Sequence, residues 1–197
     1  MKKKISEMFR ESITNEELID LPLKSFEGRI VLVDSDHKLE KAIKDLSRQN
    51  VIGFDTETKP SFKKGAGNKV ALLQLSTRET AYLFRINRIG LPEAIRRILA
   101  DGKIIKPGVA IRDDIKGLQE INHFHPAGFV ELQDQAREMG IQNFSLKKLT
   151  AIACGFRISK GQQLTNWEAA QLTEAQQVYA ATDAWAALVI FENFSEN

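Results

Sequence analysis

A short acidic motif behind an apolar run constrains this chain more than any other feature. Residues 51–54 (V-I-G-F) are mostly apolar, and Asp55 and Glu57 follow directly. Such a run is typical of a buried strand, although periodicity alone does not separate it from a buried piece of helix. Because side chains alternate along a strand, the two acids would lie on the same face. Neighbouring carboxylates repel each other, so the motif predicts a proton or a divalent cation between them. An isolated D-x-E is nevertheless common as a loop or capping feature.

The rest of the chain alternates between strand and helix patterns. The strand patterns before residue 90 fall at residues 29–33, 51–54, 70–75 and 81–86. The last two are separated by a short polar stretch and predict a hairpin. Strand and helix patterns then alternate to residue 153, and a final helix begins near Thr173, which forms a capping-box pattern with Gln176. This order predicts an α/β fold with a mixed, mainly parallel central sheet flanked by helices.

Length and composition suit one domain. The chain has 197 residues, of which 43% are hydrophobic, enough for one sizeable core. We assign residues 29–197 to this domain and residues 1–28, which are polar and of mixed charge, to a helical or partly ordered N-terminal extension. There is one cysteine and no apolar segment long enough to span a bilayer. We therefore expect a soluble, cytoplasmic protein that does not act at a membrane.

Further acids could join the motif at two places. Tyr179 and Asp183 are four residues apart in the last helical pattern, so they lie on one helix face. Their neighbours are apolar, and an acid there is costly unless it is paired, although an exposed stripe would also accommodate it. Asp113 and Asp114 open a helical pattern behind a predicted strand. One could cap this helix while the other projects over the strand ends, where ligands of open α/β sheets bind.

In this order the motifs resemble the DEDD family of 3′–5′ exonucleases, named for four acidic residues. The stretches that carry the resemblance are G-F-D-T-E at 53–57, K-V-A-L-L-Q-L at 69–75, Y-L-F at 82–84, residues 108–118, S-L-K-K-L at 145–149, N-W at 166–167 and Y-A-A-T-D-A at 179–184. The chain is most similar to the Werner-syndrome exonuclease domain and the catalytic domain of ribonuclease D. A sister subfamily has His where this chain has Val178, so the tyrosine (DEDDy) subfamily is indicated. The resemblance implies a ribonuclease H-like fold.

The resemblance also implies an active site and a reaction. The five residues that match the family's catalytic positions are Asp55, Glu57, Asp114, Tyr179 and Asp183. Asp114 is preferred to Asp113 because the family's acid lies four residues before the leucine that Leu118 matches. The four acids would bind two divalent ions, Mg²⁺ or Mn²⁺, and the tyrosine would orient the attacking water or the scissile phosphate. The implied reaction is hydrolysis of phosphodiesters from the 3′ end of DNA or RNA, which releases nucleoside 5′-monophosphates. No small organic cofactor is expected.

Contacts to the substrate are expected from two polar loops. Basic and aromatic side chains can hold the phosphates and bases of a single strand. The candidates are Thr58, Lys59, Arg157, Lys160 and Trp167, with Lys63, Lys64 and Lys69 as further basic residues. The lysines could instead lie in a solvated loop, and we weigh the two interpretations equally. Trp167 could instead pack between helices, and for this residue we favour packing. The expected partner is a single-stranded or 3′-recessed nucleic acid, and the sequence does not fix the oligomeric state.

The sequence leaves two other functions open. One is a catalytically silent nucleic-acid-binding module on the same fold, against which the four intact acids and the tyrosine argue. The other is a phosphatase or nucleotide hydrolase that uses the same carboxylates on a small molecule. The formal net charge is only +2, which excludes a global positive field as the means of binding nucleic acid. A local basic patch or bound metal ions would have to serve instead.

Overall fold

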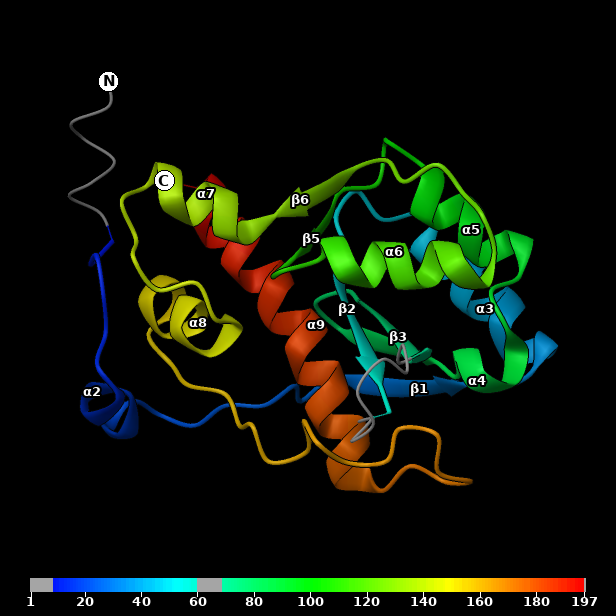
Figure 1. The fold of residues 1–197 in the computed structure, drawn as a ribbon, viewed down its shortest axis with the longest axis horizontal. Helices are drawn as coiled ribbons and strands as arrows, with labels where there is room; N and C mark the ends of the chain where they lie inside the picture. The colour runs from blue at the N-terminus through cyan, green and yellow to red at the C-terminus, as the bar shows by residue number, and fades with distance from the viewer. Residues whose placement is uncertain (1–8, 60–68, 197) are drawn as a thin grey trace.

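A mixed β-sheet lies between helices in the computed structural model, which describes residues 9–59 and 69–196 (Figure 1). The strands of the main sheet are β1 (Arg29–Val33), β2 (Gly53–Thr58), β3 (Val70–Ser76) and β4 (Thr80–Phe84). Their order is β1-β4-β3-β2; the β1–β4 pair is parallel and the other two pairs are antiparallel. Two further strands, β5 (Lys106–Gly108) and β6 (Phe129–Glu131), pair in parallel. A parallel bridge between Val51 and Ile105 joins this pair to the β2 side of the sheet.

The α/β class, the mixed sheet and the β3–β4 hairpin are confirmed. Parallel pairing is less dominant than expected, because antiparallel pairs form two of the three contacts within the four-stranded sheet. The physical reason lies in the connections. The hairpin loop between β3 and β4 is too short for a crossover, so these strands must be antiparallel, whereas parallel neighbours need a long connection.

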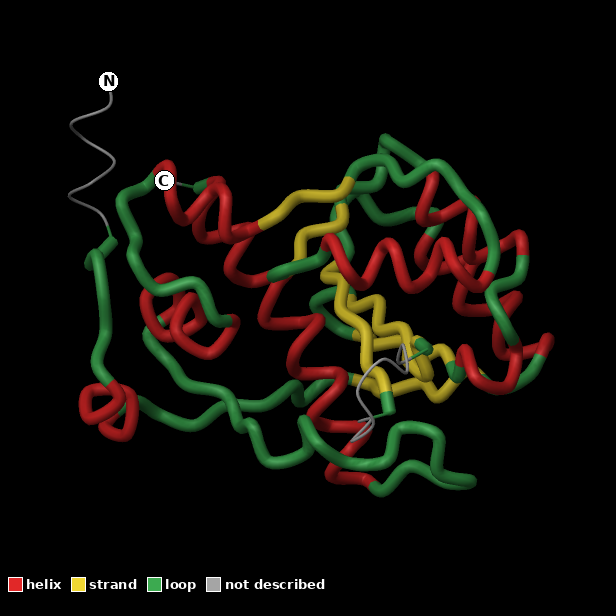
Figure 2. Tube along the Cα trace, viewed as in Figure 1, coloured by secondary structure: helices red, strands yellow, loops and turns green. Residues whose placement is uncertain are grey.

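Helices cover both faces of the sheet (Figure 2). They are α2 (Asn15–Asp20), α3 (Asp36–Leu46), α4 (Ile86–Ile89), α5 (Glu93–Ala100), α6 (Arg112–Ile121), α7 (Leu132–Glu138), α8 (Leu146–Cys154) and α9 (Glu174–Ser195). On one face, α3 and α5 share a core with Phe54 and Leu75. On the other face, α9 packs on Leu72 and Leu83. Alternate residues of the strands therefore enter different cores, as the period of two requires.

Helix α9 connects the sheet to the remaining helices. It begins at the predicted capping box, in which the Gln176 N–H donates to Thr173 Oγ1 at 3.2 Å and the Thr173 N–H donates to Gln176 Oε1 at 3.0 Å. Its second half packs against α7 and α8 and shares one hydrophobic core with them and with α2. A helix enclosed on several sides is apolar around much of its circumference. An acidic residue in the middle of α9 therefore stands out as a functional candidate.

The segment before β1 runs along the domain. Residue Leu23 forms a parallel bridge with Arg157, and the Phe26 N–H donates to Thr182 Oγ1 of α9 at 3.0 Å. The division into an extension at 1–28 and one domain at 29–197 stays a prediction. No described helix combines the length and the apolar character needed to cross a membrane, and the cytoplasmic location stays a prediction.

Candidate active site

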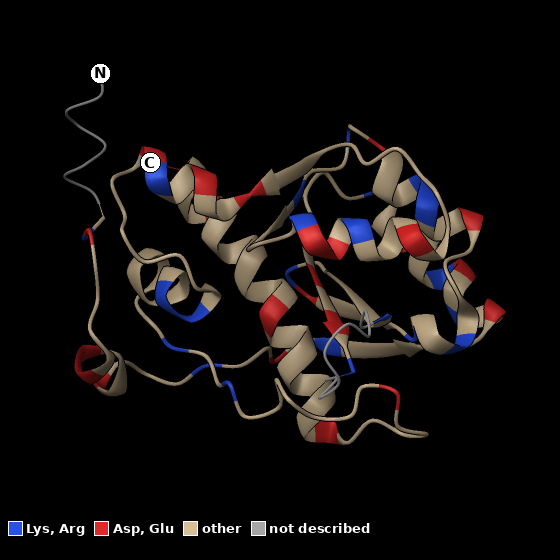
Figure 3. Ribbon diagram, viewed as in Figure 1, with Lys and Arg blue, Asp and Glu red and all other residues tan. Residues whose placement is uncertain are grey.

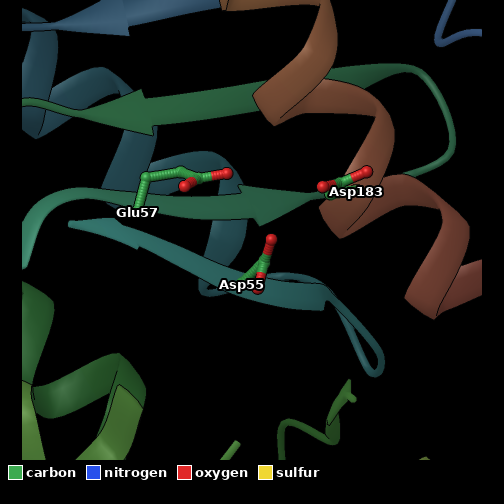
Figure 4. A group of neighbouring side chains, drawn as sticks. All are labelled: Asp55, Glu57 and Asp183. Carbon is green, nitrogen blue, oxygen red and sulfur yellow. The ribbon is translucent and has the colours of Figure 1, made fainter. Parts of the chain in front are cut away.

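Three carboxylates from two elements converge beside the sheet. Asp55 and Glu57 extend from β2, and Asp183 points toward them from α9 (Figure 4). One oxygen of each carboxylate lies within 4.8 Å of the others. The expectation that the first two acids share a face is thus confirmed. Strand β2 differs from the expected 51–54 in running through the acidic motif to Thr58, because residues from Gly53 onward pair with β3.

A close approach of α9 to β2 brings Asp183 to the strand. A Cβ atom placed on Gly53 would lie 1.8 Å from the main-chain oxygen of Ala184, the residue after Asp183. Any side chain at position 53 would therefore collide with the helix backbone. Gly53 belongs to the motif that resembles the family, but the sequence alone indicated no role for it. Its signal was a glycine within a strand pattern, which marks a place where another backbone comes close.

Asp114 approaches from a third element, the first turn of α6. The hydroxyl of Thr56 in β2 donates a hydrogen bond to its carboxylate. Asp114 stands outside the group of three, yet its charge contributes to the raised pKa of both Asp55 and Glu57. The neighbouring Asp113 is exposed. The preference for Asp114 over Asp113 therefore agrees with the geometry, although the catalytic assignment itself stays a prediction.

The turn that presents α6 is held by Glu131, a positioning residue that the sequence does not indicate. Its carboxylate accepts hydrogen bonds from the N–H groups of Ala110 and Ile111, both at 2.9 Å. Ala110 has φ of 60°, a left-handed conformation that a non-glycine residue rarely adopts. The two hydrogen bonds stabilise this turn and so fix the start of α6. An acid at the end of a short strand carried no sequence signal for this role.

Burial and mutual repulsion disfavour the ionised forms of these acids. Burial, followed by the charges of Asp183 and Glu57, raises the pKa of Asp55 well above its usual range. Burial, followed by the charges of Asp183 and Asp114, raises the pKa of Glu57 to about 9. Burial raises the pKa of Asp183 as well. The carboxyls therefore cannot all be ionised at neutral pH without a compensating positive charge.

This donor set fits a hard divalent cation. All the ligand atoms offered are carboxylate oxygens, the type that Mg²⁺ and Mn²⁺ prefer. Three of them lie within 4.8 Å of one another, close enough to share one ion. The raised pKa values reflect the repulsion that such an ion would relieve. The residues present thus match the ion class that the sequence predicts.

A cleft of about 250 Å³ opens over the carboxylates. Tyr179, one helical turn before Asp183, lines it together with the two lysines Lys147 and Lys160. Burial, followed by the charges of Asp183 and Glu57, raises the pKa of the Tyr179 hydroxyl, so this group stays protonated at neutral pH. A protonated hydroxyl can donate a hydrogen bond into the cleft but is a poor general base.

The residues predicted to contact the substrate differ in their surroundings, and not all of them line the cleft. Lys160 lines the cleft. Lys59 instead forms an ion pair with Glu168 at 3.1 Å. Arg157 donates through Nε to the Leu21 main-chain oxygen at 3.1 Å and so anchors the segment before β1. These contacts make Lys160 the strongest of the three candidates for direct contact with a substrate.

The other predicted contacts are less well placed. Trp167 is 0% exposed and its ring centroid lies 6.0 Å from that of Tyr179, so it packs behind the tyrosine in the core, which favours the packing role over substrate contact. Thr58 ends β2 beyond an irregularity in the pairing with β3. Lys63 and Lys64 lie outside the described residues. Lys147 lines the cleft but was not among the candidates, although it belongs to the S-L-K-K-L stretch.

The raised pKa of Glu57 predicts how the metal-free protein responds to pH. The folded state holds a proton on this group up to about pH 9, whereas the ordinary value is 4.5. Between these values the folded state binds more protons than the unfolded state, so the stability should fall as the pH rises. We expect the Tm in EDTA to decrease from pH 6 to pH 9, and Glu57→Gln to flatten this decrease. Parallel curves for the two proteins would contradict the prediction.

Charges elsewhere on the surface are mixed. Acidic and basic residues are interspersed along α5 and α6 (Figure 3), in keeping with the net charge of +2. Recognition of a polyanion by this chain would therefore depend on the few basic groups at the cleft and on any bound cation.

Comparisons with known proteins point to one family. A sequence model described as 3′–5′ exonuclease matches residues 30–197. The bifunctional 3′–5′ exonuclease/ATP-dependent helicase WRN of Mus musculus is 34% identical over 183 residues, which are 88% of this chain and 13% of that protein. The exonuclease mut-7 homolog of Aedes aegypti is 28% identical over 196 residues, with 86% of this chain and 27% of that protein covered. The chain therefore spans only a minor part of these relatives.

Solved structures show the same fold. The Nibbler EXO domain of Aedes aegypti matches with a TM-score of 0.79 at 25% identity, over 88% of this chain and 91% of that one. The exoribonuclease RNase D of Escherichia coli matches with a TM-score of 0.75 at 23% identity, over 85% of this chain and 44% of that one. The expected ribonuclease H-like fold is thus confirmed.

Proposed function

We propose that this chain, which belongs to the DEDD family of 3′–5′ exonucleases, is a two-metal exonuclease of the tyrosine subfamily. It would hydrolyse phosphodiesters from the 3′ end of single-stranded or 3′-recessed DNA or RNA. The observation that carries the proposal is the convergence of Asp55, Glu57 and Asp183 within 4.8 Å beneath a cleft. The products would be nucleoside 5′-monophosphates.

The four acids would hold two divalent ions, Mg²⁺ or Mn²⁺. Asp55 would be the ligand that both ions share, because the charges of the other three acids all act on it. Glu57 and Asp183 would complete one site, and Asp114 would serve the other. When bound, the ions would stabilise the charge that develops on the phosphodiester and lower the pKa of the attacking water.

The remaining cleft residues would orient the substrate. Tyr179 keeps its proton and would donate a hydrogen bond to the attacking water or to the scissile phosphate. Lys160 lines the same cleft as the acids and would contact a phosphate held there. Lys147 lines the same cleft and would contact a second phosphate.

The direct test uses a 5′-labelled oligonucleotide, as DNA and as RNA, with Mg²⁺ or Mn²⁺ and with an EDTA control. We expect a metal-dependent ladder of products that shorten from the 3′ end. Comparing the intensity of the ladder between the DNA and the RNA oligonucleotide shows which sugar the enzyme prefers. Binding without cleavage would support the silent-module alternative. Release of phosphate from mononucleotides, with oligonucleotides left intact, would support the small-molecule hydrolase.

The two adjacent lysines of α8 offer a matched test of the cleft. Lys147 lines it and Lys148 does not. We expect Lys147→Ala to raise the KM for a single strand several-fold and to reduce the slope of log affinity against log salt by about 0.7, the value for one phosphate contact on a single strand. Lys148→Ala should leave both quantities unchanged. Equal effects of the two substitutions would show that the lysines act through a general field.

A further inference from the structure

Gln74 of β3 is a buried amide that no described residue satisfies. Its side chain is 0% exposed, and neither Nε2 nor Oε1 has a hydrogen-bond partner within the described part of the chain. A buried polar group without a partner destabilises the folded state, because it gives up its hydrogen bonds to water and gains none in return. This is a cost to stability. An apolar side chain of similar size would avoid this cost, so the amide calls for a reason other than packing.

Gln74 lies directly opposite a candidate metal ligand. In the antiparallel pair of β2 and β3, the Cα partner of Gln74 is Asp55. Residues directly opposite each other project to the same face of a sheet, with Cβ atoms about 4.5–5.5 Å apart. The Gln74 amide therefore belongs to the same layer as the carboxylates, between the sheet and α9.

The other neighbours of Gln74 in this layer offer it little polar contact. Its partner on β4 is Leu83, which packs with Leu72 in the core beneath α9. Two residues further along β3, the Ser76 hydroxyl already donates to the Thr77 main-chain oxygen at 2.9 Å. The polar side chain directly opposite Gln74 on β2 is thus the Asp55 carboxylate.

We propose that Gln74 is a positioning residue that holds Asp55 for cation binding, with Nε2 donating a hydrogen bond to the carboxylate of the cation-loaded protein. This inference rests on the proposed function. A donor of this kind stabilises the ionised carboxylate and determines which oxygen faces the cation. The hydrogen-bond partners of metal ligands commonly change metal affinity or activity by 10- to 100-fold. This role explains why an amide stands where a methionine or leucine would fit.

Gln74→Met tests the inference because it retains the volume of the side chain and removes both polar atoms. We expect calorimetric affinity for Mn²⁺ to fall about 10- to 100-fold, with a matching rise in the Mn²⁺ concentration needed for half-maximal cleavage. The Tm in EDTA should equal or exceed that of the wild type, because the unpaired amide is gone. A lower Tm in EDTA with unchanged Mn²⁺ affinity would overturn the inference and leave Gln74 a packing residue.

Two control variants separate this inference from the proposed function. Leu83→Met alters the other cross-strand neighbour of Gln74 and should leave Mn²⁺ affinity unchanged. Asp55→Asn should lose Mn²⁺ binding. If the wild type binds no Mn²⁺, or if Asp55→Asn binds it normally, the metal site itself is wrong and the inference falls with it. If Asp55→Asn loses binding and Gln74→Met retains it, only the inference fails.

A second measurement uses the wild-type protein, so it does not depend on whether a variant folds. In ¹⁵N-labelled wild-type protein, the Nε2 protons of Gln74 should shift on addition of Mg²⁺ and become slow to exchange, because they gain a hydrogen-bond acceptor. A resonance that does not respond to Mg²⁺, in a protein that binds the ion by calorimetry, would overturn the inference.

Discussion

Asp55→Asn should lower kcat by at least about 10³-fold, the equivalent of several kcal/mol of lost charge stabilisation. The substitution retains the shape of the side chain and removes an anionic ligand from the centre of the acidic group. Asp55 is the position on which the charges of Glu57, Asp114 and Asp183 all converge. The measurement is single-turnover cleavage of a 5′-labelled strand by saturating enzyme, at the Mn²⁺ concentration that saturates the wild type, so that a loss of chemistry is seen apart from substrate binding.

Stability distinguishes this loss from unfolding. Removing one of several repelling carboxylates should raise the Tm in EDTA, so the variant should be inactive and more stable at the same time. Asp113→Asn is the matched control, because it removes one acid that is exposed and next to Asp114. It should retain full activity. An Asp55→Asn protein within tenfold of the wild-type rate would refute the assignment of Asp55 as a shared ligand.

Local periodicity predicts much of the site. The alternation of side chains along a strand places Asp55 and Glu57 on one face, and the helical repeat places Tyr179 one turn from Asp183. Each relation depends on a few neighbouring residues, and both appear in the structure. The order of strands and helices likewise suffices for the fold class. The meeting of β2 with α9, which are more than a hundred residues apart in the sequence, follows from the family resemblance rather than from any local pattern.

Local sequence patterns do not predict the features that depend on tertiary contacts. The apolar pattern ends at Phe54, but β2 continues because its backbone pairs with β3. An aromatic residue in a polar loop suits either a substrate contact or a packing role, and only the path of the chain buries Trp167. Glu131 acts through the backbone of a distant turn, and a single acid in the sequence does not reveal such a partner.

Gly53 shows how a contact outside local patterns can control the chemistry. The atom that a Cβ at position 53 would meet at 1.8 Å is a main-chain oxygen of α9, which cannot rotate away as the end of a side chain can. In Gly53→Ala, the helix or the strand must therefore move. Because Ala184 adjoins Asp183, a shift of the helix carries the carboxylate away from Asp55 and Glu57.

We expect Gly53→Ala to lower the free energy of unfolding by about 1–3 kcal/mol, as overpacking commonly does. The folded fraction should also lose about 10²-fold in kcat, because a displacement of about 1 Å can cost that much. Chemical denaturation and single-turnover cleavage measure the two effects separately. Gly102→Ala is the matched control, since its added Cβ meets nothing closer than the Ala127 Cβ at 3.7 Å. A stable and fully active Gly53→Ala protein would show that the contact between α9 and β2 does not set the geometry of the acids. A destabilised protein with normal kcat would show that the contact supports the fold without controlling the chemistry.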